Sequence, residues 1–235
     1  MQRVLVSLCV VAAVAGVGGC ADSGDEAILV MSNIVAGDNC TSSAGTQTVL
    51  SHGSLDVVVP TDYVFFANLK SRITALVEQV DQRTIIVDGA NVDIAFPNST
   101  LFSAAELAQL STAGLTRFQV AFSTPLPPGG TASVPFNMIP QALVERIAAK
   151  VDLSKAFRLE TLATFTVLGK MSGERVTSQP FTYAVTLGNQ ISVNITGNCS
   201  ALPTGFVARP GYSCNRFQDG VVDCCLNGGL VCPAK

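Results

Sequence analysis

The chain has 235 residues, of which 48% are hydrophobic and 13% charged, with eight cysteines, one histidine, no tryptophan and a net charge of −3. This composition excludes a disordered chain, a collagen-like repeat and a polybasic nucleic-acid binder, so we expect no nucleic-acid partner. The length predicts one or two domains that bury their own core.

The N-terminus has the pattern of a secretory signal peptide. Arg3 is the only charge in the first 21 residues, and an apolar run covers residues 4–17. A positive start followed by such a run and by small residues is typical of an export signal. The run falls short of the ~20 residues that span a bilayer, which disfavours an uncleaved anchor. The sequence therefore predicts a signal peptide over residues 1–19.

The signal ends in Val17-Gly18-Gly19-Cys20. This motif resembles the lipobox of bacterial lipoproteins, in which an aliphatic and a small residue precede a cysteine. The resemblance implies that the Cys20 thiol carries a diacylglycerol and becomes the first residue of the mature chain. Because Ala21 follows rather than aspartate, it also implies sorting to the outer membrane. The alternative is an ordinary signal peptide with a chance cysteine.

The mature chain divides into three segments by composition. Residues 20–48 are rich in Gly, Ser, Asp and Thr and predict a tether, with one short apolar patch at residues 28–31. Residues 49–198 alternate apolar and polar side chains, which indicates half-buried strands. Residues 199–235 form a short cysteine-rich tail that cannot hold a core alone.

The alternation predicts strands, a hairpin and two short helices. The expected strands are residues 55–59, 63–69, 84–96 with a bulge near Gly89, 117–123, 131–136, 157–168, 176–187 and 191–196, with a turn over residues 170–174. Ser103 and Glu106 form a capping box that opens a helix to about Leu110. Pro140 opens the second helix, whose apolar stripe is typical of packing against a sheet.

These elements predict a mainly β protein, an antiparallel β-sandwich of immunoglobulin-like or fibronectin-like type with one or two short helices and a cysteine-rich tail. The element order over residues 55–195 also resembles the water-stress (LEA14-type) β-sandwich family. That resemblance implies no catalytic residues, because the family is not known for an active site.

Six cysteines remain after the signal and the lipidated cysteine are set aside. An even number in an exported chain predicts a disulfide framework, with candidates Cys40, Cys199, Cys214, Cys224, Cys225 and Cys232. Excluding a bridge between the two neighbours leaves 12 of the 15 pairings. A bridge between Cys40 and Cys199 would clamp both ends of the sandwich, and the other four would cross-link the tail.

Two metal sites are alternatives in the tail. Four clustered thiolates resemble a zinc site, but an oxidising compartment and the lack of paired C-x-x-C spacing disfavour it. Asp219 and Asp223 resemble part of an extracellular calcium repeat, although calcium needs six to eight oxygens. We expect these carboxylates to lie in a surface turn, and no cofactor to be bound.

The sequence contains no assembled catalytic constellation. His52 is the only histidine and is predicted to lie in an exposed loop, with no G-x-S-x-G motif to complete a triad. Asp88 and Asp93 are a possible carboxylate pair, but their odd spacing places them on opposite faces of a regular strand unless a bulge at Gly89 intervenes. We therefore expect a protein that is not an enzyme.

The hypothesis that the sequence favours is that the protein is a non-catalytic lipoprotein. Its lipid would anchor it to the membrane, and it would contact another envelope component. The alternative is a ligand-binding or calcium-binding surface module. An exported hydrolase is the least favoured hypothesis, because the sequence shows no motif that brings together a catalytic acid, base or nucleophile.

Overall fold

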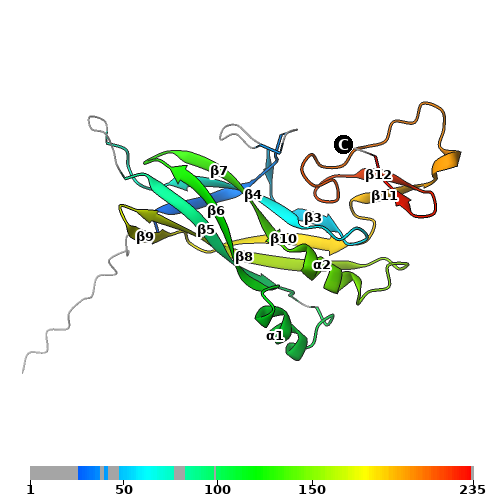
Figure 1. Ribbon diagram of the computed structural model, residues 1–235, viewed down its shortest axis with the longest axis horizontal. Helices are drawn as coiled ribbons and strands as arrows, with labels where there is room; N and C mark the ends of the chain where they lie inside the picture. The colour runs from blue at the N-terminus through cyan, green and yellow to red at the C-terminus, as the bar shows by residue number, and fades with distance from the viewer. Residues whose placement is uncertain (1–25, 38–39, 42–47, 77–82, 98, 234–235) are drawn as a thin grey trace, which may run out of the picture.

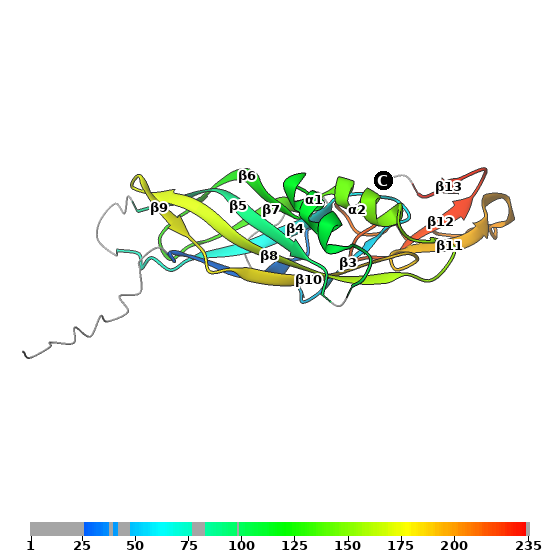
Figure 2. The same cartoon turned by 90° about the horizontal axis from the view of Figure 1, so that it is seen from below.

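A computed structural model describes residues 26–37, 40–41, 48–76, 83–97 and 99–233. These described residues form two β-sheets that pack face to face, two α-helices and a small third sheet at one end (Figures 1 and 2). This confirms the predicted fold class, a mainly β sandwich with two short helices and a cysteine-rich tail. The signal peptide and Cys20 lie outside the described residues.

The first sheet is antiparallel and has the order β2-β1-β4-β7. The second has the order β3-β10-β8-β5-β6, with β9 paired to β8 at one end. The bounds in the first sheet are β1 Ile28–Ile34, β2 Val49–Leu50, β4 Tyr63–Ser71 and β7 Thr131–Ile139. In the second they are β3 Gly53–Asp56, β5 Ile85–Ala95, β6 Arg117–Leu126, β8 Arg158–Met171, β9 Glu174–Thr177 and β10 Phe181–Gly188.

Aromatic side chains fill the space between the two sheets. The Phe65 ring of β4 lies 5.0 Å from the Phe165 ring of β8, and the Phe136 ring of β7 lies 5.2 Å from the same ring. Both Phe65 and Phe165 are fully buried. Strands alternate these inward side chains with outward polar ones, which is why the period-2 pattern located them.

The predicted bulge lies in β5 and changes the faces of its carboxylates. The register shifts between Val87 and Gly89 in both pairings of β5. A Cβ at Gly89 would lie 2.4 Å from the Val120 carbonyl oxygen, so the close approach requires glycine. The extra residue turns Asp88 outward together with Asp93, so the strand follows the bulged alternative and not the regular one.

Both predicted helices form. Helix α1 spans Ala104–Thr112 and has the full capping box, in which Ser103 caps the Glu106 N–H and the Glu106 side chain returns to Ser103. Helix α2 spans Gln141–Ala148 after Pro140 and buries Leu143, Val144 and Ile147. These three side chains belong to the sandwich core.

The N-terminal tether prediction is wrong for residues 28–34, which form β1. The apolar patch within that segment supplies the strand, and β1 pairs with β4 in the middle of the first sheet. The long strand predicted at residues 176–187 is divided, because β9 and β10 are separated by residues 178–180. The sandwich is also not wholly antiparallel, since β3 pairs with β10 in parallel.

The last predicted sandwich strand belongs instead to the tail. Strand β11, Val193–Asn198, pairs in parallel with β12, Val222–Leu226, which pairs with β13, Leu230–Val231. A short 3-10 helix, Cys199–Ala201, follows β11. The boundary predicted after residue 198 therefore moves ahead of β11.

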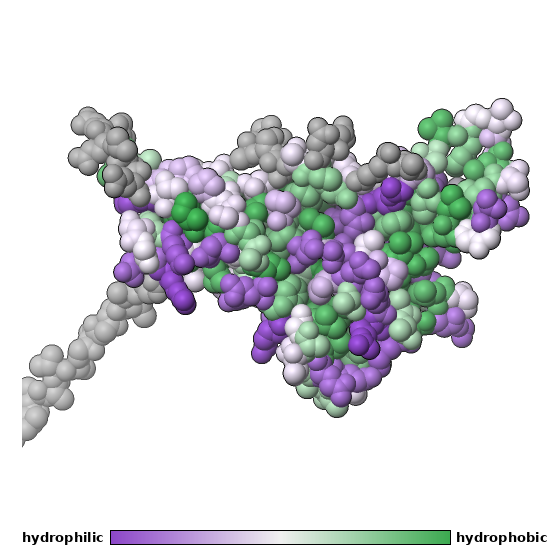
Figure 3. Space-filling model, viewed as in Figure 1, coloured by the Kyte–Doolittle hydropathy of each residue, from purple (hydrophilic) through white to green (hydrophobic). Residues whose placement is uncertain are grey.

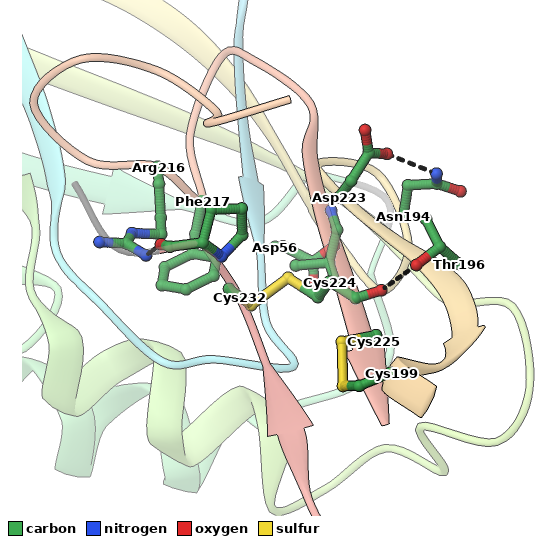
Figure 4. The surroundings of a disulfide bond; sticks show 12 residues. Asp56, Asn194, Thr196, Cys199, Arg216, Phe217, Asp223, Cys224, Cys225 and Cys232 are labelled. Atoms are coloured by element: carbon green, nitrogen blue, oxygen red, sulfur yellow. Dashed lines mark hydrogen bonds between the residues drawn. A yellow bond between two sulfur atoms is a disulfide. The ribbon is translucent and has the colours of Figure 1, made fainter. Parts of the chain in front are cut away.

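Two disulfides staple the tail, Cys199–Cys225 and Cys224–Cys232 (Figure 4). The predicted bridge between Cys40 and Cys199 is wrong, because β11 carries Cys199 away from the sandwich and beside β12. Each bridge joins two positions within the tail, so neither ties the tail to the sandwich.

The first described residues and the tail lie at opposite ends of the long axis. Glu26 lies beside the segment after β9, where its carboxylate accepts a hydrogen bond of 2.7 Å from Gln179. The tail strands β11 and β12 lie at the other end in both views (Figures 1 and 2). The sandwich therefore separates the start of the described chain from the tail.

Candidate functional site: the junction between sandwich and tail

A network of buried and half-buried hydrogen bonds lies at the junction where the tail meets β3, β4 and β10. Asp56, the last residue of β3, is completely buried there. Its Oδ2 accepts hydrogen bonds from the backbone N–H groups of Ile191, Ser192 and Val193, at 3.0, 3.2 and 3.0 Å. Its Oδ1 accepts a fourth from Val58 at 3.0 Å. One carboxylate thus holds the start of β11 on the end of the sandwich.

Asp219 is the second carboxylate of the junction and comes from the tail itself. Its Oδ1 accepts a hydrogen bond of 2.7 Å from the Ser54 N–H, and its Oδ2 accepts one of 2.8 Å from the Tyr63 hydroxyl. The Asp219 N–H returns a bond of 3.0 Å to the Ser54 carbonyl. The residue has a φ of 50°, a left-handed conformation that aspartate tolerates better than most side chains.

Burial governs the electrostatics of this pair. Removal from water raises the pKa of Asp219 from 3.8 to about 6, although its hydrogen bonds from Ser54 and Tyr63 act in the opposite direction. Burial and the nearby Asp219 charge raise the pKa of Tyr63 well above its usual value. The tyrosine therefore remains a neutral hydrogen-bond donor to the carboxylate.

An amide extends the network into the first sheet. The Asn33 Nδ2 group of β1 lies 3.2 Å from the Tyr63 hydroxyl and 3.1 Å from the Tyr183 hydroxyl, and donates to both oxygens. Its Oδ1 accepts a bond of 3.0 Å from the Phe66 N–H. Burial raises the pKa of Tyr183 as well. Strands β1, β4 and β10 are thereby joined to the tail through side chains.

The side-chain amide of Gln218 bonds to the backbone at the start of β4 as a neighbouring strand would. Its Oε1 accepts from the Val64 N–H at 2.9 Å, and its Nε2 donates to the Val64 carbonyl at 3.0 Å. Asn215 adds a bond of 2.6 Å from its Nδ2 to the Asp62 carbonyl. The side-chain amides of this tail segment thus bond to the backbone at the start of β4, beyond the last paired residue of β1.

His52 takes part in a hydrogen-bonded chain with Thr186 and Glu160. Thr186 Oγ1 donates to the Glu160 carboxylate at 2.7 Å and lies 2.7 Å from His52 Nε2. Because the single hydroxyl proton is given to the carboxylate, His52 Nε2 must be the donor to Thr186. In a nucleophilic triad the histidine takes the hydroxyl proton, so this order does not activate the threonine.

The other acidic candidates are engaged by protein donors. Asp223 accepts from Asn194 at 2.6 Å and from three N–H groups of Arg209, which hold the pKa of the carboxyl well below its usual range. Asp88 lies 3.8 Å from the Lys170 ammonium, and Asp93 lies 2.6 Å from the Arg117 guanidinium. The structure places Asp219 and Asp223 in two separate networks.

The described residues contain no cluster of three or more histidine, cysteine or acidic side chains that could hold a metal ion. Four of the candidate cysteines form the two tail disulfides, which uses the thiols that the zinc alternative requires. Within the same residues, no helix combines the length and apolarity needed to cross a membrane.

A surface cavity of about 270 Å³ lies between α1 and α2. Its lining combines the apolar side chains of Phe102, Leu110 and Leu115 with the cationic groups of Arg146 and Lys150. Lys150 is paired with Glu106 and lies 5.2 Å above the Phe102 ring. The Lys150 pairing and the capping hydrogen bonds of Ser103 lower the pKa of Glu106 to about 2.

Comparison of the chain with protein-family models and with curated protein sequences finds no match. The chemistry of the junction and of the surface is therefore what bears on function.

Sequence reasoning located Asp219 and Asp223 but missed the other residues of the junction, namely Asp56, Asn33, Tyr63 and Gln218. Asp56 has one local signal, since an acidic residue at the end of an apolar strand is unusual unless its carboxylate has donors. The other three bond to residues at least 30 positions away, Asn33 to Tyr63, Tyr63 to Asp219 and Gln218 to Val64, and nothing local identifies these contacts.

Proposed function

We propose that the chain is a non-catalytic lipoprotein of the bacterial envelope, anchored through Cys20, that contacts another envelope protein with its tail. The observation that carries the proposal is the arrangement along the long axis. The chain enters the sandwich at the end near β9, and the tail lies at the opposite end (Figures 1 and 2). A lipid at the N-terminus would hold the β9 end of the sandwich at the outer membrane. The tail would then be directed away from the membrane.

The tail has the surface that such a contact requires. Half of the twelve large apolar side chains exposed among the described residues belong to it, and Val207 is 87% exposed. The others in the tail are Ile195, Phe206, Val221, Leu226 and Val231. Figure 3 shows apolar atoms gathered over this end of the molecule. Clustered exposed apolar side chains are typical of protein interaction surfaces.

The junction supports a rigid role for the tail. Asp56 and Asp219 together accept backbone hydrogen bonds from the tail and the sandwich, and the two disulfides fix the tail internally. A rigid surface loses less conformational entropy when it binds a partner. The hydrogen-bonded order of His52, Thr186 and Glu160 favours a structural role over catalysis.

The test is a crosslinking pull-down from native membranes with the full lipidated chain. We expect one stoichiometric envelope protein with the wild type. Val207→Asp should abolish its recovery, because a charge in the apolar surface must be desolvated on binding. Ile86→Asp, an exposed apolar position of β5 near the opposite end, is the matched control and should leave recovery unchanged.

The anchor is tested separately by fractionation. Cys20→Ser should move the chain from the membrane pellet to the soluble fraction, because the acylated thiol is lost. Recovery of that variant in the pellet would contradict lipid anchoring. Equal partner recovery with Val207→Asp would contradict the tail as the contact surface, and crosslinks to lipid alone would replace the protein partner with a membrane.

A ligand-binding module is the second candidate, and the cavity between α1 and α2 is the observation that favours it. Its apolar lining and the Arg146 guanidinium among the lining residues suit a small amphipathic carboxylate. Binding of a short-chain fatty acid, measured by calorimetry and lost in Arg146→Ala, would favour this function over the first.

A further inference from the structure

Cys40 and Cys214 are the two candidate cysteines that lie outside the tail disulfides, and a bond between them would link the tail to the sandwich. The two bridges join Cys199 to Cys225 and Cys224 to Cys232, all within the tail. Cys40 follows the first strand of the sandwich, and Cys214 lies in the tail segment that docks on it. A bridge between them would be the first disulfide that joins the tail to the sandwich.

We propose that Cys40 and Cys214 form a third disulfide that fastens the tail to the sandwich. The proposal rests on the proposed function in one respect, since export supplies the oxidising compartment in which such a bond forms.

The structure brings the two residues together. The Cys40 Sγ lies 3.6 Å from the carbonyl oxygen of Ser213, the residue directly before Cys214. Standard backbone geometry then puts this sulfur within about 6.5 Å of the Cys214 Cα.

Neighbouring contacts hold the two segments in that position. The Ala36 N–H donates a hydrogen bond of 2.6 Å to the hydroxyl oxygen of Tyr212, which lies two residues before Cys214. Ile34, Ala36, Phe66 and Tyr212 form a small buried cluster, and Cys214 packs against it. The half-buried thiol of Cys214 thus lies on the side of the tail that meets the end of β1.

The electrostatics of Tyr212 agree with this placement. Burial raises the pKa of Tyr212 to about 12, and the nearby thiols of Cys214 and Cys40 add to the rise. Both thiols are therefore close to one hydroxyl. Cys40 is exposed, so an incoming oxidant can reach it.

The reaction is ordinary thiol–disulfide exchange with the disulfide of an envelope oxidoreductase. The Cys40 thiolate attacks one sulfur of the donor disulfide and forms a mixed disulfide, releasing the other donor sulfur as a thiol. The Cys214 thiolate then attacks the Cys40 sulfur and releases the second donor thiol. Two protein thiols are oxidised, one donor disulfide is reduced, and the two protons pass to the donor.

The test is peptide mapping of the lipidated chain purified from its membrane, with N-ethylmaleimide present and no reductant. Digestion with chymotrypsin separates Cys214 from Cys199, because Phe206 and Tyr212 lie between them. We expect a crosslinked peptide pair containing Cys40 and Cys214, and no label on either cysteine. The same digestion after reduction should release both peptides.

The variant Cys40→Ser provides the matched control. It should place one N-ethylmaleimide label on Cys214 and leave both tail disulfides intact. The melting temperature of Cys40→Ser/Cys214→Ser should fall by on the order of 5–10 °C, because the lost bridge closes a very long loop.

Incubation of the reduced, folded chain with oxidised glutathione separates this inference from the proposed function. A crosslink that forms in glutathione but not in the membrane would support the pairing and contradict export to an oxidising compartment. Label on both cysteines under both conditions, or a crosslink of Cys40 to any other cysteine, would overturn the third disulfide.

Discussion

The Tyr63 hydroxyl donates a hydrogen bond of 2.8 Å to Oδ2 of Asp219. This bond joins the first residue of β4 to a tail residue 156 positions later in the chain. Asp219 carries a raised pKa there because it is buried. The pair shows how the tail is held, because the Asp219 carboxylate is removed from water and accepts hydrogen bonds from fixed protein donors instead.

Asp219 makes the stability of the protein depend on pH. Its pKa rises from 3.8 to about 6 on folding, so between those values the folded state binds more protons than the unfolded state. The free energy of unfolding therefore falls as the pH rises from about 4 to 6, by about 3 kcal/mol for this group. Urea unfolding at a series of pH values measures the slope.

The variant Asp219→Asn should remove that slope, because it cannot ionise, while Asn still tolerates the left-handed backbone. Glu174→Gln, an exposed acid of β9, is the control and should retain the wild-type slope. An unchanged slope in Asp219→Asn would show that another group titrates.

Asp56→Ala should release the start of β11 from the sandwich. Four backbone N–H groups lose their acceptor, and we expect the free energy of unfolding to fall by about 3–5 kcal/mol. Limited proteolysis should then cut first near residues 189–193. Asp56→Asn keeps one acceptor oxygen and should give an intermediate loss, and a wild-type digestion pattern in Asp56→Ala would contradict this role.

Ser103→Ala should weaken the start of α1. The Ser103 hydroxyl accepts from the Glu106 N–H, and loss of an N-cap side chain costs about 1 kcal/mol. Hydrogen exchange of the first turn of α1 should quicken accordingly. Ser111→Ala, near the end of the same helix, is the control and should not lower stability, because alanine favours helix.

Calcium should leave the melting temperature unchanged. The carboxylate oxygens of Asp219 and Asp223 accept hydrogen bonds from the protein, so a cation would have to displace those donors. Differential scanning calorimetry with calcium and with a chelator checks this. A rise of several degrees with calcium that disappears in Asp223→Asn would instead favour the calcium-binding alternative.

The local elements of this fold were predictable from the sequence. The alternation of apolar and polar residues located most sandwich strands, the Ser103 and Glu106 pair located α1, and Gly89 marked the bulge. The tether prediction was wrong at β1, because composition rich in Gly and Ser outweighed the short apolar patch at residues 28–31.

The sequence by itself determined the strand periodicity, the helix caps and a cysteine-rich tail, because each depends on residues that are close along the chain. Only the tertiary structure decided that β11 leaves the sandwich for β12, that Cys199 pairs with Cys225, and that Asp56 receives the tail. Asp56 and Val193 are 137 positions apart. A contact of that kind depends on the packing of the whole chain, since a buried carboxylate takes whichever donors the fold brings to it.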